Sequence, residues 1–93
     1  MASCSVSPDP CPVGSQYSVS VSGATSGDFL QAWVQDSHGL QVLGCDPVAA
    51  DGMTQGQSYA SWPGDYAVTI YHVYFKGNKQ HKDEVGSCIF TAA

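Results

Sequence analysis

The chain contains no arginine, and charged residues make up only 12% of its 93 residues, about half the share found in an average soluble protein. Eight acidic residues outnumber three lysines, which gives a formal net charge of −5. Affinity for nucleic acid comes mainly from basic side chains that neutralise phosphates, and anionic lipid surfaces attract the same side chains. The composition therefore argues against a nucleic-acid partner and against binding to an anionic membrane surface.

Long apolar runs and catalytic motifs are also missing. No stretch approaches the roughly 20 apolar residues of a membrane-spanning helix, so we expect no membrane insertion. None of the serines stands in Gly-x-Ser-x-Gly, and His38, His72 and His81 lie far apart in the sequence. The cysteines show neither Cys-x-x-Cys nor the cysteine-to-histidine spacing of a zinc finger. We therefore expect a protein that is not an enzyme and that holds neither a metal nor a cofactor.

Two segments carry the clearest strand pattern. In residues 16–22, Tyr17, Val19 and Val21 alternate with serines, which is the period-two pattern of a half-buried strand. Residues 66–75 are almost all β-branched or aromatic and follow a Pro-Gly-Asp turn, which fits a buried strand far better than a helix. No segment combines a helix cap with a helical apolar period.

Short strands separated by turn signals are predicted over the whole chain, so residues 1–93 are expected to form a single domain. About seven such strands are typical of an all-β, two-layer antiparallel β-sandwich. The polar stretch 76–84 is predicted to be a loop, the stretch 48–57 a loop or ragged edge, and Trp62 is expected to plug the end of the core. The predicted strands lie around Val6 and over residues 16–22, 29–36, 40–43, 57–62, 66–75 and 85–91.

Three alternating segments carry a resemblance to a known class of domains. They are Tyr17/Val19/Val21, Leu30-x-Ala32-x-Val34-x-Asp36 followed by Gly39, and Gly64-x-Tyr66-x-Val68-x-Ile70. With them the chain resembles the broad immunoglobulin-like or fibronectin-III-like sandwich class of secreted and surface proteins. The resemblance implies that Tyr66 is a corner tyrosine whose hydroxyl bonds to upstream backbone. Val68 stands where antibody domains carry a cysteine, so the chain departs from that subfamily.

The four cysteines, an even number, predict two disulfides and hence an oxidising compartment, which indicates a secreted or cell-surface protein. Three pairings are possible. The prolines between Cys4 and Cys11 can fold that segment back, which favours Cys4–Cys11 together with Cys45–Cys88. The pairing Cys4–Cys88 is the rival, because the first and last strands of such sandwiches often run side by side.

The aromatic residues give the best functional indication. If the even-numbered apolar residues of 29–36 face the core, Trp33 faces the opposite way, and Tyr71 on the neighbouring strand shares its face. We predict a ligand-binding patch at Trp33 and Tyr71, together with Gln31, Gln35 and Phe75 on the same face. In the alternative, a bulge reverses the parity of one strand and Trp33 is a core tryptophan.

The leading interpretation is a non-catalytic binding or adhesion module whose ligand, a protein or a carbohydrate, lies on that aromatic face. A second interpretation is a self-associating structural module, because a homodimer would cover the same apolar face. A third is a small-molecule carrier, since the size, acidity and cysteine content are similar to those of the apoproteins of the enediyne chromoproteins. The three lysines, Lys76, Lys79 and Lys82, gather in the polar stretch, which is either a solvated loop or a docking loop for an acidic partner.

Overall fold

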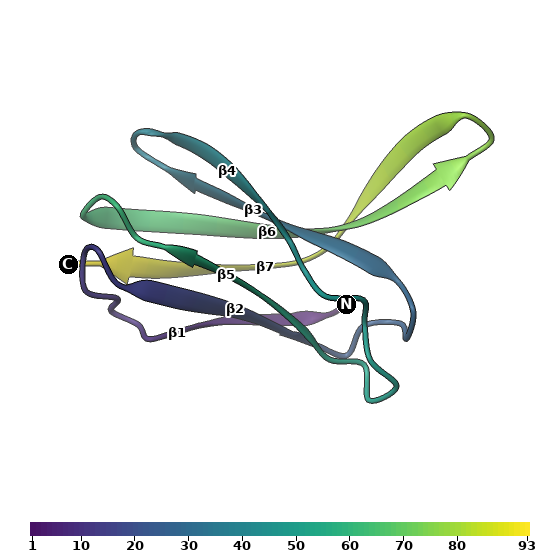
Figure 1. Ribbon diagram of the computed structural model, residues 1–93, viewed down its shortest axis with the longest axis horizontal. Helices are drawn as coiled ribbons and strands as arrows, with labels where there is room; N and C mark the ends of the chain where they lie inside the picture. The colour runs from purple at the N-terminus through teal and green to yellow at the C-terminus, as the bar shows by residue number, and fades with distance from the viewer.

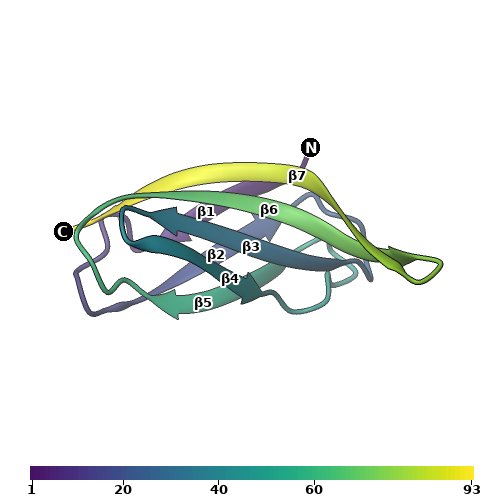
Figure 2. The same ribbon diagram turned by 90° about the horizontal axis from the view of Figure 1, so that it is seen from above.

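A computed structural model describes the whole chain, Met1–Ala93. Seven strands form two antiparallel sheets that pack face to face, which confirms the predicted all-β sandwich (Figure 1). The sheets have the strand orders β1-β2-β5 and β4-β3-β6-β7, and Figure 2 shows β1 and β7 along one side of the molecule and β4 and β5 along the other. No helix is present that would be long and apolar enough to cross a membrane. The strands are β1 (Ser3–Ser7), β2 (Gln16–Ser22), β3 (Phe29–Asp36), β4 (Gly39–Gly44), β5 (Thr54–Tyr59), β6 (Gly64–Lys76) and β7 (Lys79–Ala92).

The core lies between the two sheets and is built by the predicted alternation. In β2, Tyr17, Val19 and Val21 are buried, while the serines between them stay partly exposed. β3 buries its even-numbered apolar residues, and β6 packs Val68 and Ile70 beside them. Full burial of a side chain of this size stabilises a fold by about 1.5–3 kcal/mol. The two-residue period of these strands therefore builds the core and also decides which residues face outwards.

Three aromatic rings fill one end of the core. Phe90 packs against Tyr17 and against Tyr66, with ring centroids 4.7 Å apart in both pairs. The Tyr66 hydroxyl donates to the Trp62 carbonyl at 2.7 Å, and the Trp62 N–H donates to the same hydroxyl at 3.2 Å. The prediction that Tyr66 bonds to upstream backbone is confirmed, and these two bonds hold the loop that leads into β6.

Tyr17 lies in the same aromatic cluster but its hydroxyl is placed differently. The oxygen is buried, and no donor or acceptor meets it in hydrogen-bond geometry. Burial raises the pKa of Tyr17 above its usual 10.0 because the phenolate would lose its solvation. The two buried tyrosines thus resemble each other in ring packing, but only Tyr66 has hydrogen-bond partners for its hydroxyl.

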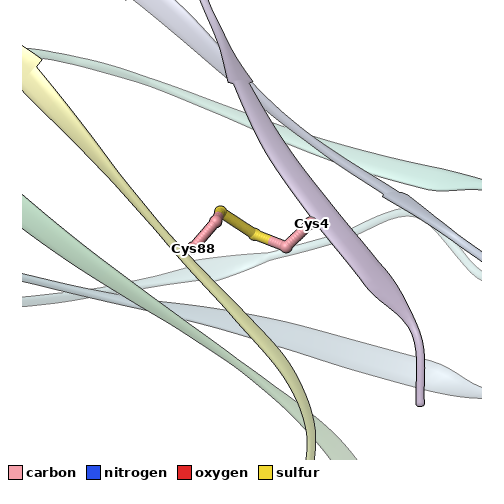
Figure 3. The surroundings of a disulfide bond; sticks show 2 residues. All are labelled: Cys4 and Cys88. Carbon is pink, nitrogen blue, oxygen red and sulfur yellow. A yellow bond between two sulfur atoms is a disulfide. The ribbon is translucent and has the colours of Figure 1, made fainter.

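The cysteines are paired differently from the favoured prediction. The single disulfide joins Cys4 on β1 to Cys88 on β7, across the two layers, and Cys11 and Cys45 are free thiols (Figure 3). The Cα atoms of Cys4 and Cys88 are 5.5 Å apart, which is within the usual range for a disulfide. Cys11 is drawn away from Cys4 because its N–H donates to the Thr91 carbonyl, and Cys45 follows β4 at the opposite edge of the sheet from β7. The predicted pairs Cys4–Cys11 and Cys45–Cys88 are therefore wrong, and the rival pair Cys4–Cys88 is the one that forms.

The stretch that was predicted to be a polar loop is a β-hairpin. β6 continues to Lys76 and β7 begins at Lys79, with a two-residue turn that starts at Gly77. Gly77 has a φ of 64°, and glycine favours this left-handed conformation at the first position of a tight hairpin turn. Cross-strand contacts hold the two strands together, such as the stacked rings of Tyr74 and His81. Polar side chains on an exposed hairpin gave no apolar alternation from which the strands could be predicted.

Residues 74–81 form the free end of this hairpin, which we call the β6–β7 arm. The pairing of β6 with β3 stops at Val73, so the arm has no third strand, and Figure 1 shows it rising away from the opposite sheet. A shift in register between Ile70 and Tyr71 marks a β-bulge just before the arm begins. Bulges bend the strand that carries them, so the four-stranded sheet curves towards its outer side.

β5 ends earlier than predicted, and Trp62 consequently lies outside the core. The strand spans Thr54–Tyr59 rather than 57–62, and the buried Ala60 closes the core at this end. Trp62 is 47% exposed, and its indole stacks on the His38 ring with 4.1 Å between centroids. The expectation that Trp62 plugs the core is therefore wrong, because Tyr66 holds the Trp62 backbone and leaves its side chain on the surface.

Removal of the disulfide is expected to be strongly destabilising. Cys4 and Cys88 are 84 residues apart in the sequence, and a bridge that closes a loop of this order contributes about 4–5 kcal/mol by restricting the unfolded chain. We expect Cys4→Ala/Cys88→Ala to lose most of this free energy of unfolding in urea titrations. The control Cys45→Ala, which removes a free thiol, is expected to lose about 1 kcal/mol or less. Equal losses in the two variants would contradict the bridge.

The two buried tyrosines make a matched pair for a second test. Tyr66→Phe removes a hydroxyl that takes part in two hydrogen bonds, so we expect the free energy of unfolding to fall by about 1–2 kcal/mol. Tyr17→Phe removes a buried hydroxyl without a partner, so we expect no loss and a gain of up to about 1 kcal/mol. The free energy of unfolding of both variants is measured in urea. Equal losses in Tyr66→Phe and Tyr17→Phe would show that the hydrogen bonds of the Tyr66 hydroxyl contribute nothing to stability.

Candidate binding surface on the outer sheet face

The outer face is the side of the β4-β3-β6-β7 sheet that looks away from the other sheet. The register sets Gln31 opposite Tyr71, and Trp33 opposite Thr69 and Val42. Directly opposed residues of an antiparallel ladder project to the same face. The chain neighbours of Trp33 are buried in the core, whereas Trp33 itself is only half-buried. Trp33 therefore lies on the outer face as the parity predicts, and the alternative of a core tryptophan is wrong.

Four side chains meet on this face and form what we call the Trp33 cluster: Trp33, Tyr71, Gln31 and Lys82. The Tyr71 ring meets the indole edge-on with 5.3 Å between centroids, a favoured geometry for aromatic pairs. The indole N–H donates to the Gln31 side-chain oxygen at 3.1 Å. The Lys82 ammonium lies 3.6 Å from the Trp33 ring centroid and 4.8 Å from that of Tyr71. One cation is thus shared by two aromatic rings on a partly exposed surface.

Lys82 is the member of this cluster that the sequence patterns did not assign to the patch. It lies on β7 opposite Val73, two strands away from Trp33. Its ammonium reaches the indole because the hairpin bends at the bulge and rises on the outer side of the sheet (Figure 1). The gathering of three lysines in one stretch was the only signal in the sequence. Which lysine reaches the ring depends on the bend, and no sequence pattern predicted that bend.

The other two predicted binding residues lie apart from the cluster. The Gln35 amide donates to the carbonyls of Asp36 and Gly39 at 3.1 and 2.9 Å, so it closes the β3–β4 turn. Phe75 is exposed on the β6–β7 arm, beyond the last pair of β3 with β6. The structure thus brings Trp33, Tyr71 and Gln31 together and separates Gln35 and Phe75 from them.

Five large, exposed apolar side chains share the outer face with the Trp33 cluster, and one of them, Val42, lies directly opposite Trp33. Soluble monomers rarely expose a large contiguous apolar patch, and such patches usually mark interaction sites. The cluster also borders a hollow of about 270 Å³ on its arm side, lined by Gln31, Trp33, Val73, Gln80, His81 and Lys82. The exposed apolar residues of this face are Phe29, Leu40, Val42, Phe75 and Ile89.

A second aromatic site lies at the end of the sandwich. The stacked pair of His38 and Trp62 lines a hollow of about 280 Å³ between the β3–β4 turn and the loop after β5. Tyr59 and Leu40 add exposed apolar surface, and Asp36 adds a carboxylate that accepts from the His38 and Gly39 N–H groups. The site is built from two turns, whereas the Trp33 cluster is built on paired strands.

The ionisable groups are dispersed over the molecule. No three or more histidine, cysteine or carboxylate side chains lie close enough together to hold a metal ion. His72 Nε2 is 3.6 Å from the Asp28 carboxylate, and both side chains are partly exposed, so His72 is not a fully buried imidazole. Burial raises the pKa of the Cys45 thiol, and the neighbouring Asp46 adds to the effect. Cys45 therefore stays protonated at neutral pH and is a weak nucleophile.

Comparisons of the chain with protein-family models, with curated proteins and with solved structures found no match. A sandwich architecture alone does not determine a function, because many unrelated functions share it. The chemistry and geometry of the outer face are therefore the basis for a functional conclusion.

The contact between Lys82 and Trp33 is expected to be small but measurable. A double-mutant cycle with Lys82→Gln and Trp33→Ala is expected to give a coupling energy of about 0.5–1 kcal/mol in urea unfolding. Lys79→Gln is the matched control, since Lys79 lies at the end of the arm and makes no cation–π contact, and its coupling to Trp33 is expected to be near zero. Trp33→Ala alone is expected to cost less than about 2 kcal/mol. A cost of about 3–5 kcal/mol, as for a buried aromatic residue, would contradict its outer position.

Proposed function

We propose that this chain is a non-catalytic binding module of an extracellular protein and that its outer face binds a protein partner through the Trp33 cluster. The observation that carries the proposal is an aromatic cluster on the side of the sheet that the core does not use. Ala32 and Ile70 supply the core side of the same strands, so Trp33 and Tyr71 are not needed to close the sandwich. Aromatic residues bury a large area at low entropic cost and dominate the energetics of protein interfaces.

The geometry favours a protein over a carbohydrate as the ligand. The Lys82 ammonium covers the Trp33 ring, and Gln31 accepts the indole N–H, so both groups are engaged before any ligand arrives. The apolar residues around the cluster extend over all four strands of the sheet, from Val42 on β4 to Ile89 on β7. A broad face of this kind suits the roughly 800 Å² that each partner contributes to a standard protein interface.

The partner that we propose carries an acidic group that meets Lys82 beside the aromatic rings. Lys82 lies on the outer face, opposite Val73, and Glu84 lies on the same face, opposite Tyr71, whereas Lys76 and Lys79 oppose each other on the other face at the end of the hairpin. Opposite charge around an apolar centre speeds association and fixes the orientation of the partners.

The topology and the disulfide support an extracellular, fibronectin-III-like module. β4 pairs with β3 and so joins the sheet of β6 and β7, whereas in antibody constant domains the fourth strand joins the sheet of the first two. The Cys4–Cys88 bridge is of the kind that persists in oxidising compartments. We therefore infer a secreted or cell-surface protein.

A binding screen with matched variants tests the proposal. Immobilised wild-type protein is probed with a panel of extracellular proteins and, in parallel, with a glycan array. We expect a protein ligand whose dissociation constant rises at least about thirtyfold in Trp33→Ala, as for a central interface residue. Lys82→Glu is expected to lower the association rate at low salt more than at high salt, because it reverses a charge beside the contact.

Trp62→Ala is the matched control, since Trp62 is an exposed tryptophan on a different surface. Its binding is expected to equal that of the wild type, and circular dichroism checks that every variant is folded. Unchanged binding by Trp33→Ala, a loss in Trp62→Ala, or binding to glycans alone would each contradict the proposal.

A further inference from the structure

We propose that β4 is a pairing edge through which two copies of this chain join their four-stranded sheets into one continuous sheet. β4 is the last strand of its sheet, and β5, the last strand of the other sheet, lies on the same side of the molecule (Figure 2). The opposite side is closed by the Cys4–Cys88 disulfide and by backbone bonds from Ala2 and Cys11 to β7. On the other side a backbone bond joins the layers only beyond the end of β4, from the Asp46 N–H to the Gln55 carbonyl, so the edge of β4 itself is open.

The open edge of β4 presents backbone groups to solvent. The Cys45 N–H donates to the Leu30 carbonyl, so Cys45 and Leu30 form a hydrogen-bonded pair and the backbone groups of Cys45 point towards β3. Opposed pairs of an antiparallel ladder alternate between hydrogen-bonded and non-hydrogen-bonded, so the odd-numbered residues of β4 bond to β3. The N–H and C=O groups of Leu40 and Val42 therefore point away from the sheet, and neither residue takes part in a backbone bond outside the ladders.

β4 lacks every usual protection of an edge strand. Natural sheets guard their edges with charges, prolines, bulges or a covering segment. The sequence of β4, Gly-Leu-Gln-Val-Leu-Gly, contains no charge and no proline, and its register with β3 has no shift. Its residues up to Val42 are exposed, so no other segment of the chain covers this part of the edge.

The occupant that best fits this edge is a second copy of β4. Two antiparallel copies related by a two-fold axis at Gln41 set Leu40 opposite the partner's Val42, and Val42 opposite the partner's Leu40. Both residues point their backbone groups outwards, so these two pairs are the hydrogen-bonded ones of the new ladder. No charged side chains oppose each other, and the arrangement closes after two copies, as a two-fold interface does.

The size of the contact predicts how strong the dimer is. One six-residue strand covers less than the roughly 800 Å² per partner of a standard interface. The dimer is therefore expected to be weak and dependent on protein concentration. Pairing sets Leu40 and Val42 beside the same residues of the partner, so the outer faces of the two copies become one larger apolar surface.

Sedimentation velocity over a wide range of protein concentration tests the proposal. Wild type is expected to shift from monomer to dimer as the concentration rises. Val42→Pro removes an outward N–H and leaves the bonds between β4 and β3 in place, and at a two-fold interface it removes two bonds. We expect the dissociation constant of the dimer to rise at least about tenfold. Val42→Thr, which keeps the N–H, is the matched control and is expected to dimerise like the wild type.

A charge exchange at Gln41 provides a second test that does not alter the backbone. Gln41 is exposed and lies on the two-fold axis, so Gln41→Glu sets two carboxylates opposite each other and Gln41→Lys sets two ammonium groups. Each variant alone is expected to dimerise more weakly than the wild type, and their equimolar mixture is expected to form the mixed dimer. Both variants are checked for native unfolding profiles.

Three results would overturn the proposal. Wild type that stays monomeric at every concentration excludes the dimer. A dimer that survives Val42→Pro, with no gain on mixing the two Gln41 variants, excludes β4 as the contact. A dimer that is abolished by Thr69→Lys, a change in the middle of the outer face and away from β4, shows that the two copies meet face to face instead.

Discussion

The strict alternation of β3 and β6 is the constraint on which the rest of the structure depends. Ala32 and Ile70 are opposed in the core, and the next residues along the same strands, Trp33 and Tyr71, are thereby directed outwards. A slip of one residue would exchange the two faces and force an indole into the space of a methyl group. The core and the candidate binding surface are thus two sides of a single geometric condition, and neither can change without the other.

The two sides of the sandwich have different physical characters. On the β1/β7 side, the disulfide joins the layers covalently, and backbone hydrogen bonds from Ala2 and Cys11 to β7 leave little free edge. On the β4/β5 side, the Asp46 N–H donates to the Gln55 carbonyl just beyond the end of β4, and β4 itself keeps unpaired backbone groups along its edge. The single disulfide restricts the unfolded chain from the β1/β7 side, and the edge of β4 on the other side remains free to take part in association.

The sequence allowed the strands with clear alternation to be predicted, because their period is a local property. The buried residues of β2 and β3 and the outward position of Trp33 agree with that period, whereas the corner bonds of Tyr66 were implied by the resemblance to immunoglobulin-like sandwiches. The disulfide partner of Cys4, the contact of Lys82 with Trp33 and the surface position of Trp62 did not follow from that period. Each of these depends on how distant segments approach one another, and no local pattern carries that information.

The low charge of the chain makes its apolar outer face physically significant. Charged side chains are the usual means of keeping an exposed sheet soluble, and here the outer face has few of them. Lys82 partly compensates, since its stem and ammonium cover the Trp33 ring in the free protein. The same position holds a positive charge over the Trp33 and Tyr71 rings, with Glu84 on the same face opposite Tyr71. In the complex that we propose, the side chain that covers the Trp33 ring in the free protein would also be the one that attracts an acidic group of the partner.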